Sequence, residues 1–102
     1  MVERVALIKL KPAHANAAAR EALVRRALDE LGGLPGVTSL SAGVPADAAS
    51  EASWDVIITV RCASAADLDA YRAHPTHRRF VDEAVVPVSD VRKGWSFVVE
   101  FA

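Results

Sequence analysis

The chain has 102 residues, of which 52% are hydrophobic and 25% are charged, and its formal net charge is -1. This length predicts one domain over residues 1–102. Nothing in the near-neutral charge suggests a basic surface of the kind that binds nucleic acid, and no apolar run approaches the length of a membrane span. The single cysteine, Cys62, excludes an intrachain disulfide, and the first residues do not resemble a signal peptide. We therefore expect a cytoplasmic protein without nucleic-acid or membrane partners.

The first half of the chain predicts a strand, a helix and two further strands. Residues 2–11 read as a strand because apolar side chains recur along them. Asn16 is a typical cap for a helix that runs to Leu31, with its apolar stripe on one side. Residues 36–44 predict a weaker strand, and residues 45–53, rich in Ala, Ser and Asp, predict a flexible loop. Alternating apolar residues over 54–61 predict the clearest strand of the chain.

The rest of the chain predicts two helical segments and a last strand. Ser64 begins a predicted helix over residues 64–73, and Pro75 is suited to the first position of a second, short helix. Val86-Pro87 predicts a turn, and residues 91–101 predict the last strand. The resulting βαββαβ order is that of a ferredoxin-like α+β sandwich with a four-stranded antiparallel sheet.

The first strand carries apolar side chains on both of its sides. Val5 and Leu7 alternate with Ala6, Ile8 and Leu10. The two helices of a ferredoxin-like fold cover only one face of the sheet, so the other face would expose apolar residues to water. A symmetric homodimer that packs two such faces together removes this exposure. The pattern therefore predicts pairing of two copies into a dimeric α+β barrel.

Two of the three histidines and the only tyrosine fall within one short segment. Pro75 pushes the preceding residue, His74, out of the helical region, which predicts a helix break there. His77 lies three residues before Phe80 and shares its apolar stripe, and Tyr71 lies on the apolar side of the preceding helix. Both side chains are therefore expected to point into the interior.

An imidazole and a phenol directed at an apolar interior are typical components of a proton-transfer site or a ligand pocket. We therefore treat His77 and Tyr71 as candidate catalytic residues. The candidate ligand-binding residues are His74, Val56, Ile58 and Trp95. The alternative is structural: an inward histidine can be a satisfied core residue, and a His-Pro pair can simply cap a turn. His74 and His77 have a spacing that would suit a metal ion, but no third ligand is evident, so no metal site is expected.

Three segments carry a resemblance to a known family. They are the first strand over residues 5–11, the Gly- and Pro-containing link over 31–37, and the second half from Trp54. The strongest element is the motif from Tyr71 to Phe80, followed by Val86-Pro87. With these segments the chain resembles the stress-responsive dimeric α/β-barrel (Dabb) family over nearly its whole length. The resemblance implies a homodimer whose two sheets form one barrel, with a cavity between sheet and helices in each protomer.

The resemblance also implies roles for two residues. In a plant enzyme with this pattern, which cyclises a polyketide to olivetolic acid, the tyrosine of the motif forms a hydrogen bond and the second histidine acts as a base. These roles would fall on Tyr71 and His77, acting on a small apolar or aromatic ligand without a cofactor. The chain departs from that enzyme at Arg4 and near Val56, where the enzyme has histidines. This departure leaves the substrate and the reaction open.

Two other functions remain compatible with the sequence. The first is a non-catalytic dimer in which the motif only holds the helix break. The second is a cofactor-independent or haem-type monooxygenase, since such enzymes use similar dimeric barrels. A histidine would then be an axial haem ligand, but the chain carries no haem-specific signature.

Overall fold

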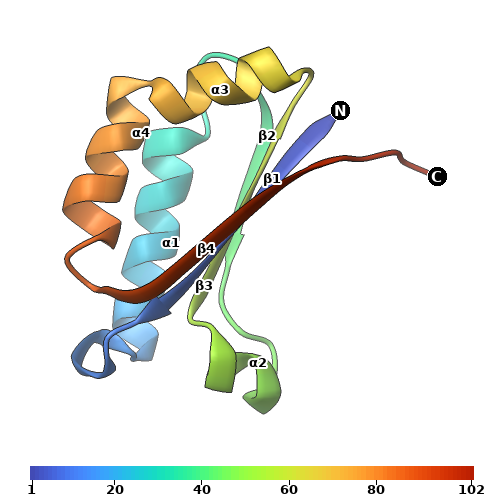
Figure 1. Cartoon of the computed structure of the whole chain (residues 1–102). Coiled ribbons are helices and arrows are strands. Elements are labelled where there is room, and N and C mark those ends of the chain that lie inside the picture. Colours follow the sequence, from blue (N-terminus) through green and yellow to red (C-terminus); the bar gives the residue numbers. More distant parts are fainter.

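Four antiparallel strands form the sheet, in the spatial order β2-β3-β1-β4. The computed structural model describes every residue from 1 to 102. The strands are β1 (Val2–Leu10), β2 (Val37–Gly43), β3 (Val56–Cys62) and β4 (Ser89–Val98). Strands β1 and β3 are central, and β2 and β4 form the two edges. The long helices lie on one face of the sheet, and the opposite face carries none of them (Figure 1). This is the predicted βαββαβ arrangement.

The first helix, α1 (Ala17–Leu31), follows a single 3-10 turn at Pro12–His14. Its start is the one predicted, because the side chain of Asn16 accepts a hydrogen bond of 2.9 Å from the amide of Ala19. The helix packs one side on the sheet. Its buried residues are Leu23, Ala27 and Leu31.

The predicted helix break at Pro75 is confirmed. Helix α3 (Ala65–Ala73) ends before His74, and α4 (Pro75–Phe80) begins directly after it. His74 has an extended backbone, with φ −60° and ψ 136°, as expected for a residue that precedes proline. Because His74 interrupts the helix, α4 leaves at a different angle from α3 and runs alongside α1 (Figure 1).

A widened, π-helical turn over Val81–Val85 extends α4. It is closed by a 2.9 Å hydrogen bond from the amide of Val86 to the carbonyl of Val81. Such i to i+5 turns are rare and are often found at functional sites. Phe80 before the turn and Val85 at its end are both buried.

One element differs from its prediction. Residues 45–53 were expected to form a flexible loop, but Ala48–Ser53 form a short helix, α2. The helix begins at Asp47, whose carboxylate accepts a 2.8 Å hydrogen bond from the amide of Ser50. Hydrogen bonding to Ser50 lowers the pKa of Asp47. The composition of the segment indicates a loop, but Ala-rich sequence after a capping Asp also suits a helix.

The core lies between the helices and the sheet. Burial alternates along β3, where Val56, Ile58, Val60 and Cys62 are buried and face the helices. Burial also raises the pKa of the Cys62 thiol, so the thiolate form that would act as a nucleophile is disfavoured. Cys62 therefore packs as a small apolar residue of the core.

A fully buried carboxylate, Asp55, ties β1 to α1. Its Oδ2 accepts a 2.7 Å hydrogen bond from the amide of Leu10, and its Oδ1 accepts bonds of 2.9 and 2.8 Å from the guanidinium of Arg20. Lys9 lies 3.7 Å from the same carboxylate. Burial by itself would raise the pKa of Asp55, but these hydrogen bonds and charges outweigh burial and lower it.

The helix-free face of the sheet is apolar in its middle. Trp95 of β4 lies opposite Val5 of β1, and Ile57 of β3 lies opposite Leu7. Trp95 is 49% exposed and Phe97, on the same side of β4, is 54% exposed. We call this surface the open sheet face; its apolar residues are Val5, Leu7, Ile57, Val91, Trp95 and Phe97. None of the helices combines the length and hydropathy needed to cross a membrane.

Candidate functional site

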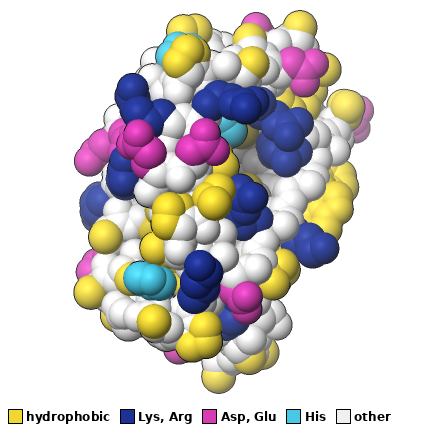
Figure 2. All heavy atoms as spheres, turned by 60° about the vertical axis from the view of Figure 1, so that its left-hand side comes forward, with side chains coloured by type: hydrophobic (Ala, Val, Ile, Leu, Met, Phe, Trp, Pro, Cys, Tyr) yellow, Lys and Arg dark blue, Asp and Glu magenta, His cyan; other side chains and the backbone are white.

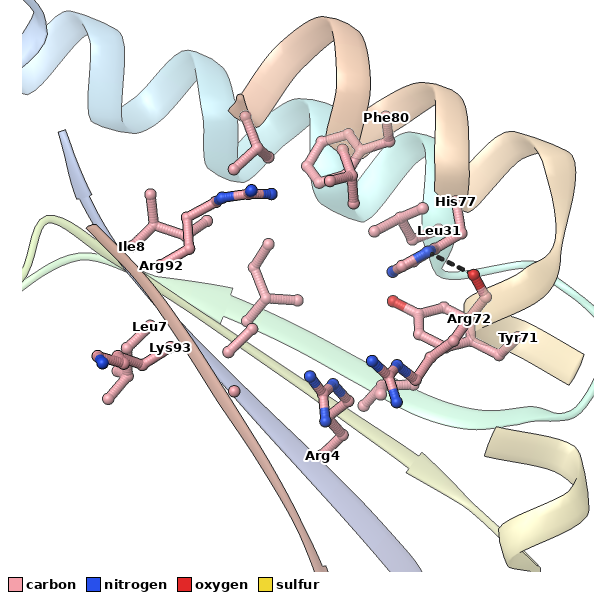
Figure 3. Close-up of a pocket in the computed structure, with 16 residues that line it drawn as sticks. Arg4, Leu7, Ile8, Leu31, Tyr71, Arg72, His77, Phe80, Arg92 and Lys93 are labelled. Atoms are coloured by element: carbon pink, nitrogen blue, oxygen red, sulfur yellow. Dashed lines mark hydrogen bonds between the residues drawn. The ribbon is translucent and has the colours of Figure 1, made fainter. Parts of the chain in front are cut away.

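A cavity of about 280 Å³ lies between the sheet and the segment that contains Tyr71 and His77 (Figure 3). Its volume is that of about nine water molecules, so it suits a molecule of one or two rings. Side chains from β1, β3, α1, α4 and the π-helical turn form its apolar walls. These residues are Ala6, Ile8, Leu31, Ile58, Val60, Phe80, Val81 and Val85.

Tyr71, at the end of α3, is only 3% exposed, and its hydroxyl reaches the cavity. That hydroxyl forms no hydrogen bond within the chain, and its oxygen is not fully buried. Burial raises the pKa of Tyr71 to about 12, an effect that the nearby charge of Cys62 increases and that of Arg4 opposes. The phenol therefore stays protonated and can donate a hydrogen bond into the cavity.

His77 faces Tyr71, with 4.7 Å between the ring centres and a tilt of 57°. Its Nδ1 lies 3.0 Å from the carbonyl oxygen of Arg72. Because a carbonyl can only accept, Nδ1 must carry the proton and donate it. In the neutral ring this leaves Nε2 as an unprotonated acceptor. The helix break supplies this contact, since Arg72 precedes His74 and His77 follows it.

The surroundings of His77 favour its neutral form. Burial is the largest effect and lowers the pKa of His77 below its usual value. The hydrogen bond to the carbonyl of Arg72 opposes this shift, but the positive charges of Arg72, Arg4 and Arg78 lower the pKa further. Near neutral pH, Tyr71 is thus a protonated donor and His77 an unprotonated acceptor.

The other predicted ligand-binding residues lie in different places. Ile58 does line the cavity, but Val56, two residues earlier in β3, does not. His74 is also absent from the cavity. Its Nδ1 accepts a 3.1 Å hydrogen bond from the amide of Thr76, so it caps α4. His74 therefore has the capping role that we gave as the structural alternative, and the prediction that it lines the ligand pocket is corrected.

Trp95 was predicted as a wall of the same pocket, and this placement is also corrected. Strand β4 is an edge strand, but this is not the reason, since Arg92 and Gly94 of the same strand line the cavity. Trp95 pairs with Val5, whose side chain points away from the helices, so the indole lies on the open sheet face. The sheet itself separates Trp95 from Tyr71 and His77.

Sequence reasoning missed the charged part of the cavity. Arg4, Arg72 and Arg92 line it, and Figure 3 shows their side chains on the same side of the sheet as His77. Arg4 donates a 3.1 Å hydrogen bond to the Oγ of Ser96, and its guanidinium lies over Gly94, where a Cβ would collide with it. One signal was available: Arg4 is the only charged residue at the inward positions of β1, where the others are Val2, Ala6, Ile8 and Leu10.

No cluster of three or more metal-ligating side chains lies in the structure. The side chains at the cavity that can donate or accept hydrogen bonds are a phenol, an imidazole and guanidinium groups. This set can polarise a carbonyl and accept a proton beside it.

Comparison with known proteins agrees with this fold. The sequence profile of the Dabb family, described as the stress responsive A/B barrel domain, matches residues 2–101. A comparison with curated protein sequences gives no match. Solved structures of similar fold include a Dabb protein from Mesorhizobium loti with a ferredoxin-like fold, at 19% identity and a TM-score of 0.80, covering 98% of this chain and 97% of that one.

Two further structures show the same fold. A dimeric ferredoxin-like protein from Thermobifida fusca has 19% identity and a TM-score of 0.78, and the match covers 96% of this chain and 90% of that one. A protein from Nitrosomonas europaea, described as a candidate antibiotic biosynthesis monooxygenase, has 15% identity and a TM-score of 0.78, with coverage of 99% and 100%. The predicted ferredoxin-like fold and the predicted family are both confirmed, and this chain belongs to the Dabb family of stress responsive A/B barrel domains.

Proposed function

We propose that this protein is a cytoplasmic homodimer that binds one small apolar or aromatic molecule beside Tyr71 and His77 and performs acid–base chemistry on it. The main support is the pairing of a protonated phenol with an unprotonated imidazole at an apolar cavity. Catalytic bases work best when the unprotonated form is abundant at the working pH. The single, buried Cys62 supports a reducing location.

The proposed chemistry is proton removal next to a carbonyl group. Nε2 of His77 would take the proton from the carbon, the electron pair of the C–H bond would form a C=C bond, and the π pair of the carbonyl would move onto its oxygen. The hydroxyl of Tyr71 would donate a hydrogen bond to that oxygen as its negative charge develops. The carbon of the resulting enolate could attack a second carbonyl of the same molecule, as in a cyclase, forming a C–C bond while the π pair of that carbonyl moves onto its oxygen. The imidazolium would then give the proton to this new alkoxide.

A dimer through the open sheet face is the second part of the proposal. The solved structures of similar fold include proteins described as dimeric. The exposed side chains of Trp95, Phe97 and Ile57 form the apolar surface that such a contact requires. Pairing two copies should bury more than about 1,200 Å² in total, which is the range of stable interfaces.

The neighbour described as a candidate monooxygenase supports a second function on the same cavity. A monooxygenase without a cofactor would also need a base to form a substrate anion, and His77 could supply it. The two functions differ in their second reactant. Substrate-dependent uptake of dioxygen would favour the monooxygenase, and turnover in the absence of dioxygen would favour the cyclase-like reaction.

We expect His77→Ala to reduce turnover by about 10² to 10⁴ and to leave the fold intact, because the loss of a general base typically has this effect. The substrate would be sought by native mass spectrometry of freshly purified protein, followed by a screen of small aromatic ketones. His14→Ala is the matched control, since His14 is exposed and lies in the 3-10 turn away from this cavity.

The pH profile provides an independent check. Because the pKa of His77 is lowered, the unprotonated base should persist below the usual imidazole value of about 6.5, and turnover should decline only as the pH falls through the lowered pKa. A purely structural motif predicts something else. In that case His77→Ala would lower the melting temperature, and ligand binding by the folded protein would be unchanged.

A further inference from the structure

The positive charges at the cavity have no negative partners within the chain. Arg4, Arg72 and Arg92 line the cavity, and no Asp or Glu does. None of these three arginines belongs to an ion pair of the chain. Figure 2 shows a hollow on the helix-bearing side of the molecule with Lys and Arg side chains around its rim.

Two of the guanidinium groups lie close to each other. Figure 3 shows the side chains of Arg4 and Arg72 side by side below the hydroxyl of Tyr71. Burial lowers the pKa of Arg4, and the repulsion from Arg72 lowers it further. Two positive charges that repel each other at the edge of an apolar cavity are stabilised by an anion between them.

The position of Arg4 is held by its neighbours. Its Nη1 donates to the Oγ of Ser96, and its guanidinium occupies the space that a side chain at position 94 would fill. Gly94 lies directly across from Ala6 in the register of β1 and β4. The strand pair therefore makes room for a guanidinium facing the cavity, where an apolar side chain would be the usual choice for an inward position.

We infer that the ligand is an organic acid whose carboxylate lies between Arg4 and Arg72 while its apolar or aromatic body rests against Ile58, Val60 and Phe80. A planar guanidinium suits a carboxylate because it can donate two parallel hydrogen bonds. Arg92 adds a further positive charge at the opening. This inference rests on the proposed function, since it assigns a ligand class to the same cavity.

The test compares two probes of equal shape, 1-naphthoate and 1-naphthamide, by isothermal titration calorimetry. The acid should bind at least about 10-fold more tightly than the amide, because a hydrogen bond to a charged group contributes about one factor of ten or more. Inorganic phosphate serves as a second probe. It should not displace the naphthoate at equal concentration.

Three variants test whether naphthoate binding depends on the charges of Arg4 and Arg72 and on the position of the Arg4 guanidinium. Arg4→Met and Arg72→Met should each weaken naphthoate binding by about 10-fold or more and leave naphthamide binding unchanged. Gly94→Ala keeps every charge but displaces the guanidinium of Arg4, so it should act like Arg4→Met. Arg25→Met is the matched control, because this exposed arginine of α1 is remote from the cavity, and it should change neither affinity.

Three results would overturn the inference. Equal affinity for acid and amide would contradict the ligand class and leave the proposed cavity function standing. Displacement of naphthoate by phosphate would show that a free anion, rather than an organic acid, is recognised. If neither naphthyl probe bound at millimolar concentration, both this inference and the proposed binding function would fail.

Discussion

Asp55→Ala is expected to reduce the free energy of unfolding by about 3 kcal/mol, a large part of the 5–15 kcal/mol typical of a domain. The variant leaves the amide of Leu10 without its acceptor and removes the anion from the guanidinium of Arg20, which retains only the exposed Glu51. At this chain length such a loss should lower the melting temperature by roughly 12–24 °C. Thermal and urea unfolding would measure it.

Asp47→Ala is the matched control for this prediction. It removes the same side chain from an exposed helix cap, where water can replace the lost hydrogen bond, so its loss should be clearly smaller. Equal losses in the two variants would show that the Asp55 network does not hold β1 to α1.

The lowered pKa of Asp55 determines how the free energy of unfolding changes with pH. The pKa of Asp55 is lower in the folded than in the unfolded chain, so its contribution is complete above the unfolded value of about 3.9. It is lost as the pH falls through the folded pKa, and Asp55→Asn should not show this acid-sensitive component.

Trp95→Asp is expected to convert the proposed dimer into monomers. Replacing a central aromatic side chain at an interface typically costs at least 2 kcal/mol, and in a two-fold dimer the change occurs twice. The dissociation constant should therefore rise by about 10³-fold or more. Sedimentation velocity over a range of protein concentrations would measure this change.

Val86→Asp is the control for dimerisation. It places the same charge on an exposed valine that lies after the π-helical turn, away from the open sheet face, and should leave the dimer intact. A wild-type protein that is monomeric at micromolar concentration would contradict the proposed dimer. A dimeric Trp95→Asp variant would show that the contact lies elsewhere.

Local features of the sequence predicted most of the fold. Strand β3 was predicted because its side chains alternate, α1 because Asn16 precedes an apolar stripe, and the break between α3 and α4 because Pro75 restricts His74. Each of these depends on neighbouring residues alone. Helix α2 was missed because its Ala- and Ser-rich sequence is compatible with both a loop and a capped helix.

Apart from Ile58, which lies on the strand with alternating side chains, the site was predicted only where it depends on one short segment. Tyr71 and His77 lie within that segment, and the structure brings them together. Arg4 and Gly94 are 90 positions apart, and their contact depends on the register between β1 and β4, which no local pattern reveals. The same register places Trp95 on the face opposite to the cavity.

The π-helical turn holds one more residue between two walls of the cavity than a regular α-helix would need. In a regular α-helix, Phe80 and Val85 would point about 140° apart, since each residue advances by about 100°. The wider turn advances less per residue, and both side chains line the cavity. Asp82 and Glu83 within the turn are exposed, so their substitution should be tolerated. Deletion of either would leave Phe80 and Val85 four positions apart, and a regular α-helix places such a pair about 40° apart, so both walls of the cavity should remain. Insertion of one residue would instead separate the two side chains by about 120° in a regular helix.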